Sequence, residues 1–473
     1  MFANAKTPPL FLWDESRLAV NALEMHQRGW SLVTTYGFVP DLWNTKPPLM
    51  IWLMNASMSL FGPSELSMRL PSMAAALGTL LVVFCFVRKV THSVPTAALA
   101  MTLLGISEAF YGEHGARTGD YDSLLCFFTT SYLCLLYFAV HQQRPRVRLL
   151  AAAGVLIALA ALTKTIAGVV PGAGVALYLL VSDRSRRALE TPRYGLMLAV
   201  GLTPLAVFYL AREWLAPGYL HAVWFNDFVG RYQAQLGPVH RPPWFFLQLM
   251  TFDWMFSAGP LAFLAPLGLI GCEGQTRRAL VYSLCCVATE LFVISLPATR
   301  LPQYMLPALP WLAIACAITA VEWFRRVSRP DGTEGTARHG VALALVAVAM
   351  VSIALPALRL RYDIVPSRAV SPEGSYGAMF ASLHDQGIRG ATIIEPGRDV
   401  SGLRAYAPQL RFYALLWNER GMKIERSERL KSAAAEPVVG TCNPKVTGAL
   451  IAIDARPVGP DGCVVVVKRS HAH

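Results

Sequence analysis

The sequence predicts an all-α polytopic membrane bundle with a small C-terminal α/β extramembrane domain. The 473 residues are 54% hydrophobic and only 15% charged, whereas a soluble domain usually carries about 25% charged residues. The apolar residues form runs of roughly twenty, and one such run can cross a bilayer as a helix. After residue 358 the composition becomes polar and mixed. These features exclude an ordinary soluble enzyme, a disordered chain and a coiled coil.

The apolar runs predict ten spans, with ends uncertain by about three residues. They cover 66–87, 93–111, 122–140, 147–163, 166–182, 194–212, 246–270, 279–298, 303–322 and 340–358. An apolar segment at 48–62 is too short to span easily and is more typical of an interfacial helix.

Basic residues are distributed unevenly between the loops. Fifteen Lys and Arg follow the odd-numbered spans, whereas the connections between spans on the opposite face hold five, namely Arg117, Lys164, Arg231, Arg241 and Arg300. The richer side is expected to be cytoplasmic. The segments 112–121, 164, 213–245 and 299–302 and both chain ends then face the periplasm of a bacterial inner membrane. This bias also explains the net charge of +12 without a nucleic-acid partner.

Three regions are expected: an external first loop with interfacial helices at 1–65, a transmembrane bundle at 66–358 and a periplasmic α/β domain at 359–473. Because no segment before residue 66 could translocate an external N-terminus well, we expect a further span upstream of Met1.

The C-terminal region is predicted to contain helices near 376–387 and 409–420 and strands at 449–455 and 463–468, the strands joined by a Gly-Pro-Asp-Gly turn. Cys442 and Cys463 lie in this region, and an oxidising compartment permits a disulfide between them. The sequence leaves that pairing open.

Unusual polar groups gather on the predicted outer face, at one membrane depth but far apart in sequence. Carboxylates that face several cations beside a bilayer suit an anionic lipid headgroup and a proton acceptor. The candidates are Asp14, Glu15, Lys46, Asp120, Asp122, Lys164, Arg231, His240 and Arg300.

Several of these candidates have a structural alternative. Asp14 and Glu15 could be a solvated acidic pair, although apolar runs flank them. Lys164, at the end of a span, could extend its ammonium group to the interface. His240 could be a lone loop histidine, and Arg300 could be an interfacial anchor.

Two further acidic features are weaker signals. Asp120 and Asp122 resemble the metal-binding DxD of nucleotide-sugar enzymes, but two nearby aspartates are common by chance. Glu290 lies inside a span, where a carboxylate is a functional candidate by default. For Glu290 we favour a structural glutamate with a partner.

Seven motifs in register resemble one family. They are WDESRLAVNALEM (13–25), KPPLMIWL (46–53), LFGPSELSMRLPS (60–72), ARTGDYDSLLCFF (116–128), ALTKTIAGVVPG (161–172), HRPPWFF (240–246) and LPQYMLPALPWLAI (301–314). Together, over about residues 8–320, they resemble the bacterial GT-C glycosyltransferases that use lipid-phosphate sugar donors. That group includes the lipid A aminoarabinose transferases and relatives of the dolichyl-phosphate-mannose protein mannosyltransferases.

The resemblance implies a role for individual residues. Asp14 matches the essential first-loop aspartate, with Glu15 beside it, and Lys46 matches the donor-phosphate lysine. Asp122 matches the second-loop carboxylate, with Asp120 as an extra candidate; Lys164 matches a basic residue at the lipid phosphate, and His240 matches a loop histidine near the active site. Arg231 and Arg300 are not part of this match; together with His240 they are further candidates to stabilise the leaving phosphate. Thr45 departs from the aminoarabinose transferases, which carry a metal-holding glutamate there. No cofactor is therefore established, and a divalent metal at Asp120 and Asp122 stays open.

The implied reaction transfers a sugar from a polyprenyl (undecaprenyl) phosphate to a hydroxyl of an envelope glycolipid, glycan or protein on the periplasmic face, by an inverting single displacement. A lipid or solute transporter is an alternative, but transporters often show repeats and midplane polar sites, and neither is evident here. A surface-polysaccharide polymerase or ligase and a catalytically inactive glycolipid-binding homologue remain as further alternatives.

Overall fold

The computed structural model describes residues 10, 14–182, 192–230, 241–252, 259–328, 336–364, 376–396, 398–400, 403–428, 436–452, 455–458 and 462–468. The chain divides into two compact units. The helical unit comprises Pro40–Met50 and Pro71–Ile364, and the mixed unit comprises Phe2–Val39, Ile51–Leu70 and Val365–His473. These units differ from the three consecutive regions expected from the sequence, which were divided at residues 65 and 358. That division stays a prediction.

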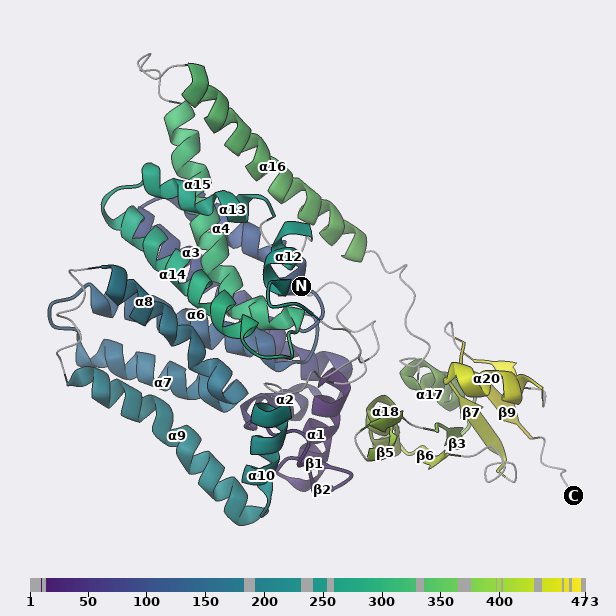
Figure 1. The fold of residues 1–473 in the computed structure, drawn as a ribbon. Coiled ribbons are helices and arrows are strands. Elements are labelled where there is room, and N and C mark those ends of the chain that lie inside the picture. The colour runs from purple at the N-terminus through teal and green to yellow at the C-terminus, as the bar shows by residue number, and fades with distance from the viewer. Residues whose placement is uncertain are drawn as a thin grey trace, which may run out of the picture. The chain divides into compact units, whose positions relative to one another are not determined.

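Helices build the helical unit (Figure 1). Its elements are α3 (Glu65–Thr91, of which Pro71 onward belongs here), α4 (Val94–Gly105), α5 (Glu108–Tyr111), α6 (Tyr121–Val140), α7 (Val147–Lys164), η1 (Thr165–Gly168), η2 (Val170–Gly172), α8 (Ala173–Val181), α9 (Arg193–Leu215), α10 (Tyr219–Val223), η4 (Trp224–Val229), α12 (Phe245–Phe252), α13 (Leu261–Leu264), η5 (Ala265–Ile270), α14 (Gly274–Ser295), η6 (Pro302–Ala308), α15 (Leu309–Val327) and α16 (Thr336–Ile364).

Six helices in the described residues are long and apolar enough to cross a membrane: Glu65–Thr91, Tyr121–Val140, Val147–Gly168, Arg193–Leu215, Gly274–Ser295 and Pro302–Arg326. Each overlaps an expected span. Other expected spans are interrupted: 93–111 is divided between α4 and α5, and 166–182 among η1, η2 and α8. The membrane-bundle prediction is therefore confirmed in its coarse form, whereas the count of ten spans is unconfirmed.

Small residues allow close helix packing next to the site described below. Helix α7 packs on both α6 and α9. A Cβ added at Gly154 of α7 would lie 2.8 Å from the carbonyl oxygen of Met197, and one at Gly201 of α9 would lie 2.9 Å from the Ile157 side chain. Only glycine lets these helices approach so closely, as is common for helices packed in membranes.

The mixed unit combines an N-terminal helix with the C-terminal domain. Its elements are α1 (Asp14–Arg28), β1 (Thr35–Tyr36), the first residue of β2 (Val39–Pro40), most of α2 (Leu49–Phe61), α17 (Tyr376–Asp385), β3 (Gly390–Ile394), β4 (Arg398–Val400), β5 (Leu403–Tyr406), α18 (Pro408–Glu419), β6 (Lys423–Ser427), β7 (Val438–Thr441), α20 (Pro444–Ile451), β8 (Arg456–Pro457) and β9 (Val464–Val467). The main sheet has the order β6-β3-β7-β9-β8. Strand β3 runs parallel to β6 and β7, and β9 runs antiparallel to its neighbours. Helix α1 packs on α18.

Most of the C-terminal prediction is confirmed. Helices α17 and α18 and strand β9 lie where they were expected, and Cys442 and Cys463 form a disulfide. The strand expected at 449–455 is wrong, because α20 occupies Pro444–Ile451. The side chain of Asn443 accepts a hydrogen bond from the Lys445 N–H and Pro444 begins the helix, which together form a strong helix start.

Candidate functional site

A pocket in the helical unit is lined by both charged and apolar residues. About 850 Å³ of empty space lies between its walls, part of it open to solvent. The polar lining residues are Lys46, Asp122, Lys164, Thr165, Asp227, Glu290, Thr299 and Tyr304, and the apolar wall includes Leu125, Ile166, Val170, Val293, Ile294 and Pro297. An amphipathic cavity of this kind fits a ligand with an anionic head and an apolar tail.

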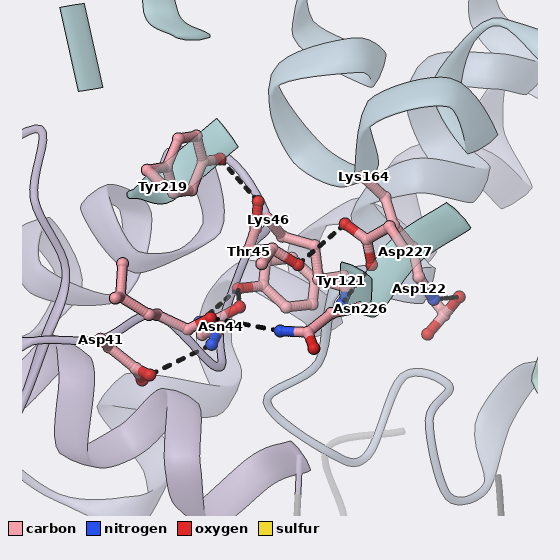
Figure 2. Close-up of polar contacts among 11 residues, drawn as sticks. Asp41, Asn44, Thr45, Lys46, Tyr121, Asp122, Lys164, Tyr219, Asn226 and Asp227 are labelled. Atoms are coloured by element: carbon pink, nitrogen blue, oxygen red, sulfur yellow. Dashed lines mark hydrogen bonds and ion pairs between the residues drawn. The ribbon is translucent and has the colours of Figure 1, made fainter. Parts of the chain in front are cut away.

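Lys46 is held at the pocket by contacts from α10 and the η4 segment (Figure 2). The Thr45 hydroxyl donates to the Asp227 carboxylate at 2.8 Å, and the Tyr219 hydroxyl donates to the Thr45 carbonyl at 2.6 Å. The Lys46 ammonium lies 3.7 Å from Asp227. Thr45 therefore acts here as a donor that anchors a carboxylate from a distant segment beside Lys46.

The loop before Lys46 is fixed from two further sides (Figure 2). The Asp41 carboxylate accepts from the Asn44 N–H at 3.1 Å. The Asn44 side chain exchanges hydrogen bonds with the Tyr121 hydroxyl at 2.9 and 3.1 Å, and Asn226 donates to the Leu42 carbonyl at 3.2 Å. Together these polar contacts, of which those of Asn44 are buried, restrict the loop and so position Lys46.

Asp122 and Lys164 form an ion pair that lines the pocket. Asp122 lies in the first turn of α6, Lys164 ends α7, and the Lys164 ammonium donates to the Asp122 carboxylate at 2.6 Å. Past Lys164 the chain turns sharply at Thr165, whose φ is 50°. A Cβ at Gly168 would lie 2.3 Å from the backbone of Ala160, so glycine is required where η1 folds back on α7. This turn directs Lys164 toward the pocket.

Asp120 lies next to this pair, at the N-cap of α6. Its carboxylate accepts from the Tyr121 N–H at 2.6 Å and contacts the His114 ring, while Ser72 donates to its carbonyl at 3.0 Å. Burial by itself would raise the pKa of the Asp120 carboxyl, but the charge and hydrogen bond of His114 outweigh that effect and lower the pKa. His114 has a left-handed backbone, with φ of 59°, and sequence reasoning gave it no role.

The arrangement of the two aspartates bears on the metal interpretation. Asp120 contacts His114, whereas Asp122 accepts from Lys164. Each carboxylate is thus already matched to a different donor, and Thr45 uses its hydroxyl on Asp227. A metal at Asp120 and Asp122 stays a prediction, and no step below depends on it.

Several sequence-predicted residues come together in this pocket, whereas Asp120 and Arg300 of the same helical unit do not line it. Lys46, Asp122 and Lys164, which are far apart in sequence, all line it. Arg300 is not among the lining residues; its guanidinium donates to the carbonyls of Ser295 at 3.0 Å and Arg241 at 2.8 Å. Those contacts suit a structural role, and phosphate binding by Arg300 stays a prediction.

Asp14 and Glu15 belong to the mixed unit. Asp14 begins α1 and is exposed, whereas Glu15 is buried and accepts two hydrogen bonds from Arg69, at 2.6 and 3.0 Å. Adjacent residues thus have opposite environments, which the solvated-pair alternative did not foresee. Arg231 and His240 lie outside the described residues.

Among the charged and aromatic lining residues, Tyr304 and Asp227 were not identified from the sequence. Tyr304, in η6, places its ring centroid 5.7 Å from the Lys164 ammonium, and it lies within the motif at 301–314 that had been noted only as a whole. Asp227 pairs with Thr45 across 182 residues. Nothing in the sequence around Asp227 signals this contact, because it arises only from the tertiary fold.

Comparison with known proteins adds to this geometry. The family model for dolichyl-phosphate-mannose-protein mannosyltransferases matches residues 45–210. An uncharacterized protein of Aquifex aeolicus is 28% identical over 318 residues, covering 67% of this chain and 60% of that protein. The undecaprenyl phosphate-α-4-amino-4-deoxy-L-arabinose arabinosyl transferase 1 of Pseudomonas fluorescens is 25% identical over 344 residues, covering 71% of this chain and 58% of that protein. The chain therefore spans about six-tenths of the length of these relatives.

A solved structure matches almost the whole chain. The crystal structure of ArnT from Cupriavidus metallidurans bound to undecaprenyl phosphate has a TM-score of 0.65 and 17% identity, covering 98% of this chain and 95% of that one. The chain therefore has the same fold as that structure. The resemblance expected from the motifs is thereby confirmed, and the six apolar helices together with these relatives indicate a multi-pass inner-membrane protein.

Proposed function

We propose that the chain is a membrane glycosyltransferase that moves a sugar from a polyprenyl phosphate to a hydroxyl of an envelope glycolipid, glycan or protein. The observation that supports this most is the convergence of Lys46 and Lys164 on one pocket with an apolar wall. Two cations suit a lipid phosphate, and the apolar wall suits the first isoprene units. The similarity to the structure of ArnT bound to undecaprenyl phosphate supports the same donor class.

The proposed reaction is a single displacement. The acceptor oxygen forms a bond to the anomeric carbon as the bond from that carbon to the phosphate oxygen breaks, which inverts the configuration. The acceptor proton passes to Asp14, on the basis of its match to the first-loop aspartate. The leaving polyprenyl phosphate gains negative charge, and Lys46 and Lys164 would stabilise it. Fixed cations in a site poor in water act strongly on such developing charge.

The active site is proposed to face the periplasm. The excess of Lys and Arg in loops opposite to the Lys46 and Lys164 face supports this orientation. A periplasmic site agrees with a lipid-linked donor, since nucleotide sugars are not supplied there.

A direct assay tests the proposal. Purified protein in lipid nanodiscs is given radiolabelled undecaprenyl phosphate sugar with a membrane extract as the source of acceptors. We expect label in an acceptor fraction, with Lys46→Ala inactive. Lys89→Ala is the matched control, because Lys89 lies in the last turn of α3 and does not line the pocket. Binding of the lipid without any label transfer would favour the inactive-homologue alternative. In a parallel assay with sealed proteoliposomes, labelled lipid that crosses the bilayer unchanged would favour a transporter.

A further inference from the structure

Glu290 is a buried glutamate with an unpartnered carboxyl oxygen, and the proposed reaction gives it no role. It lies in α14, five residues before the helix ends at Ser295, and only 5% of its surface is exposed. Its Oε2 atom is buried and has no hydrogen-bond partner among the described residues. The sequence favoured a partnered structural glutamate here, and the structure differs. Burying a carboxyl oxygen without a partner is costly, so the site retains Glu290 at a cost to folding.

The side chain of Glu290 lines the same pocket as Lys46 and Lys164. The other two lining carboxylates already have partners: Asp122 accepts from Lys164 at 2.6 Å, and Asp227 accepts from Thr45 at 2.8 Å. Glu290 is thus the described lining acid that has an unused, buried acceptor atom. Unsatisfied groups of this kind are expected where a ligand completes the hydrogen bonding.

The parts of a lipid-linked sugar differ in what they could offer Glu290. A phosphate carries negative charge and would be repelled by a carboxylate. A prenyl chain has no hydrogen-bond donor and would leave the oxygen unsatisfied. A sugar offers hydroxyl or ammonium donors, which carboxylate oxygens accept well.

We infer that Glu290 binds the sugar of the lipid-linked donor, accepting a hydrogen bond from a ring hydroxyl or an amino group, and that it helps to select which sugar is transferred. The inference rests on the proposed function and deepens it. In this arrangement the two lysines bind the phosphate, which every donor shares. Glu290 contacts the sugar, which differs between donors.

The test compares binding of three lipids by the whole protein in nanodiscs: undecaprenyl phosphate, undecaprenyl phosphate-4-amino-4-deoxy-L-arabinose and undecaprenyl phosphate-mannose. Wild-type protein is expected to bind at least one sugar-bearing lipid about tenfold more tightly than undecaprenyl phosphate. Glu290→Leu should remove that preference while leaving affinity for undecaprenyl phosphate within about twofold. Glu322→Gln is the matched control, since Glu322 is a glutamate on α15 that pairs with Arg326 and does not line the pocket.

Glu290→Gln separates the two kinds of donor. Glutamine keeps a neutral acceptor oxygen, so it should retain most of the preference for a sugar bound through a hydroxyl. It should lose the preference, by about tenfold, for a sugar bound through an ammonium group, because the ionic attraction is gone.

The outcomes are distinct. Failure of wild-type protein to bind any of the three lipids would refute the proposed function. Binding of undecaprenyl phosphate with no gain from either sugar, or an unchanged gain in Glu290→Leu, would overturn the inference alone. Thermal unfolding without lipid provides a second readout: removal of an unsatisfied carboxyl should leave the melting temperature unchanged or raise it. A fall of several degrees, with equal loss of all three lipids, would assign Glu290 a structural role and overturn the inference.

Discussion

The pair Glu15–Arg69 of the mixed unit and the pair Asp122–Lys164 of the helical unit have the same chemistry and different surroundings. In both, the cation lies 2.6 Å from a carboxylate oxygen. The Arg69 side chain is 0% exposed and its pair lines no described pocket, whereas Lys164 is 12% exposed and lines a cavity. The first pair can only hold helices together, while the second can exchange its partner for a ligand. Adjacent empty space, rather than charge itself, distinguishes the candidate functional pair.

The largest effect on activity is expected from a substitution of Asp14. Asp14 also sharpens the contrast, because it is exposed and lies next to the buried Glu15. Asp14→Asn should lower the initial rate of sugar transfer by about 100- to 10,000-fold, the usual contribution of a general base. Its melting temperature should stay near wild type, since an exposed side chain contributes little to packing. Near wild-type turnover would remove Asp14 from the proposed reaction.

Arg69→Met should instead lower the stability of the folded protein. Breaking a buried ion pair leaves a charge without its partner and typically costs about 3–5 kcal/mol. Thermal unfolding in detergent, compared with wild type, measures this loss. The double variant Glu15→Gln with Arg69→Met removes both charges and should recover part of it. If the double variant loses as much as the sum of the single variants, the two side chains are not coupled.

Lys164→Met should weaken binding of the lipid phosphate. It removes one of two cations from the pocket and leaves the Asp122 charge facing any bound phosphate. Affinity for undecaprenyl phosphate should fall about 10- to 100-fold, as expected for a hydrogen bond to a charged group. Asp122→Asn is the informative counterpart, since removing the competing anion should leave phosphate affinity the same or higher. A loss in Asp122→Asn as large as that in Lys164→Met would mean that the pair is structural, like Glu15–Arg69.

The sequence predicted the fold class and the pocket lysines for one physical reason. Membrane topology forces Lys46, Asp122 and Lys164 to one face, so the pattern of spans and charged loops is enough to group residues that are far apart along the chain. It could not assign Glu15, because the partner Arg69 is found only by packing. It also missed Asp227, whose contact with Thr45 crosses 182 residues.

Local ambiguity explains the other error. The run at 449–455 alternates well enough for a strand, yet its first residues finish a helix that Asn443 and Pro444 begin. Short apolar runs are compatible with both structures, and the capping residues upstream decide between them. Glu290 shows the reverse case, in which a general rule for buried charges predicted a partner and the pocket supplies none in the described residues.

Thr165 offers the smallest expected effect and tests whether the pocket pair depends on local strain. This β-branched residue has φ of 50° directly after Lys164, in a region that only glycine adopts readily. Strain of this kind costs about 1–3 kcal/mol and is retained where it positions a functional group.

Thr165→Gly should therefore raise the free energy of unfolding by about 1 kcal/mol. It should also weaken undecaprenyl phosphate binding a few-fold, because Lys164 is held less firmly. Gly168→Ala is the opposing control, since its Cβ would meet the Ala160 backbone at 2.3 Å and should destabilise the turn. Unchanged binding in Thr165→Gly would show that the pairing with Asp122 alone positions Lys164.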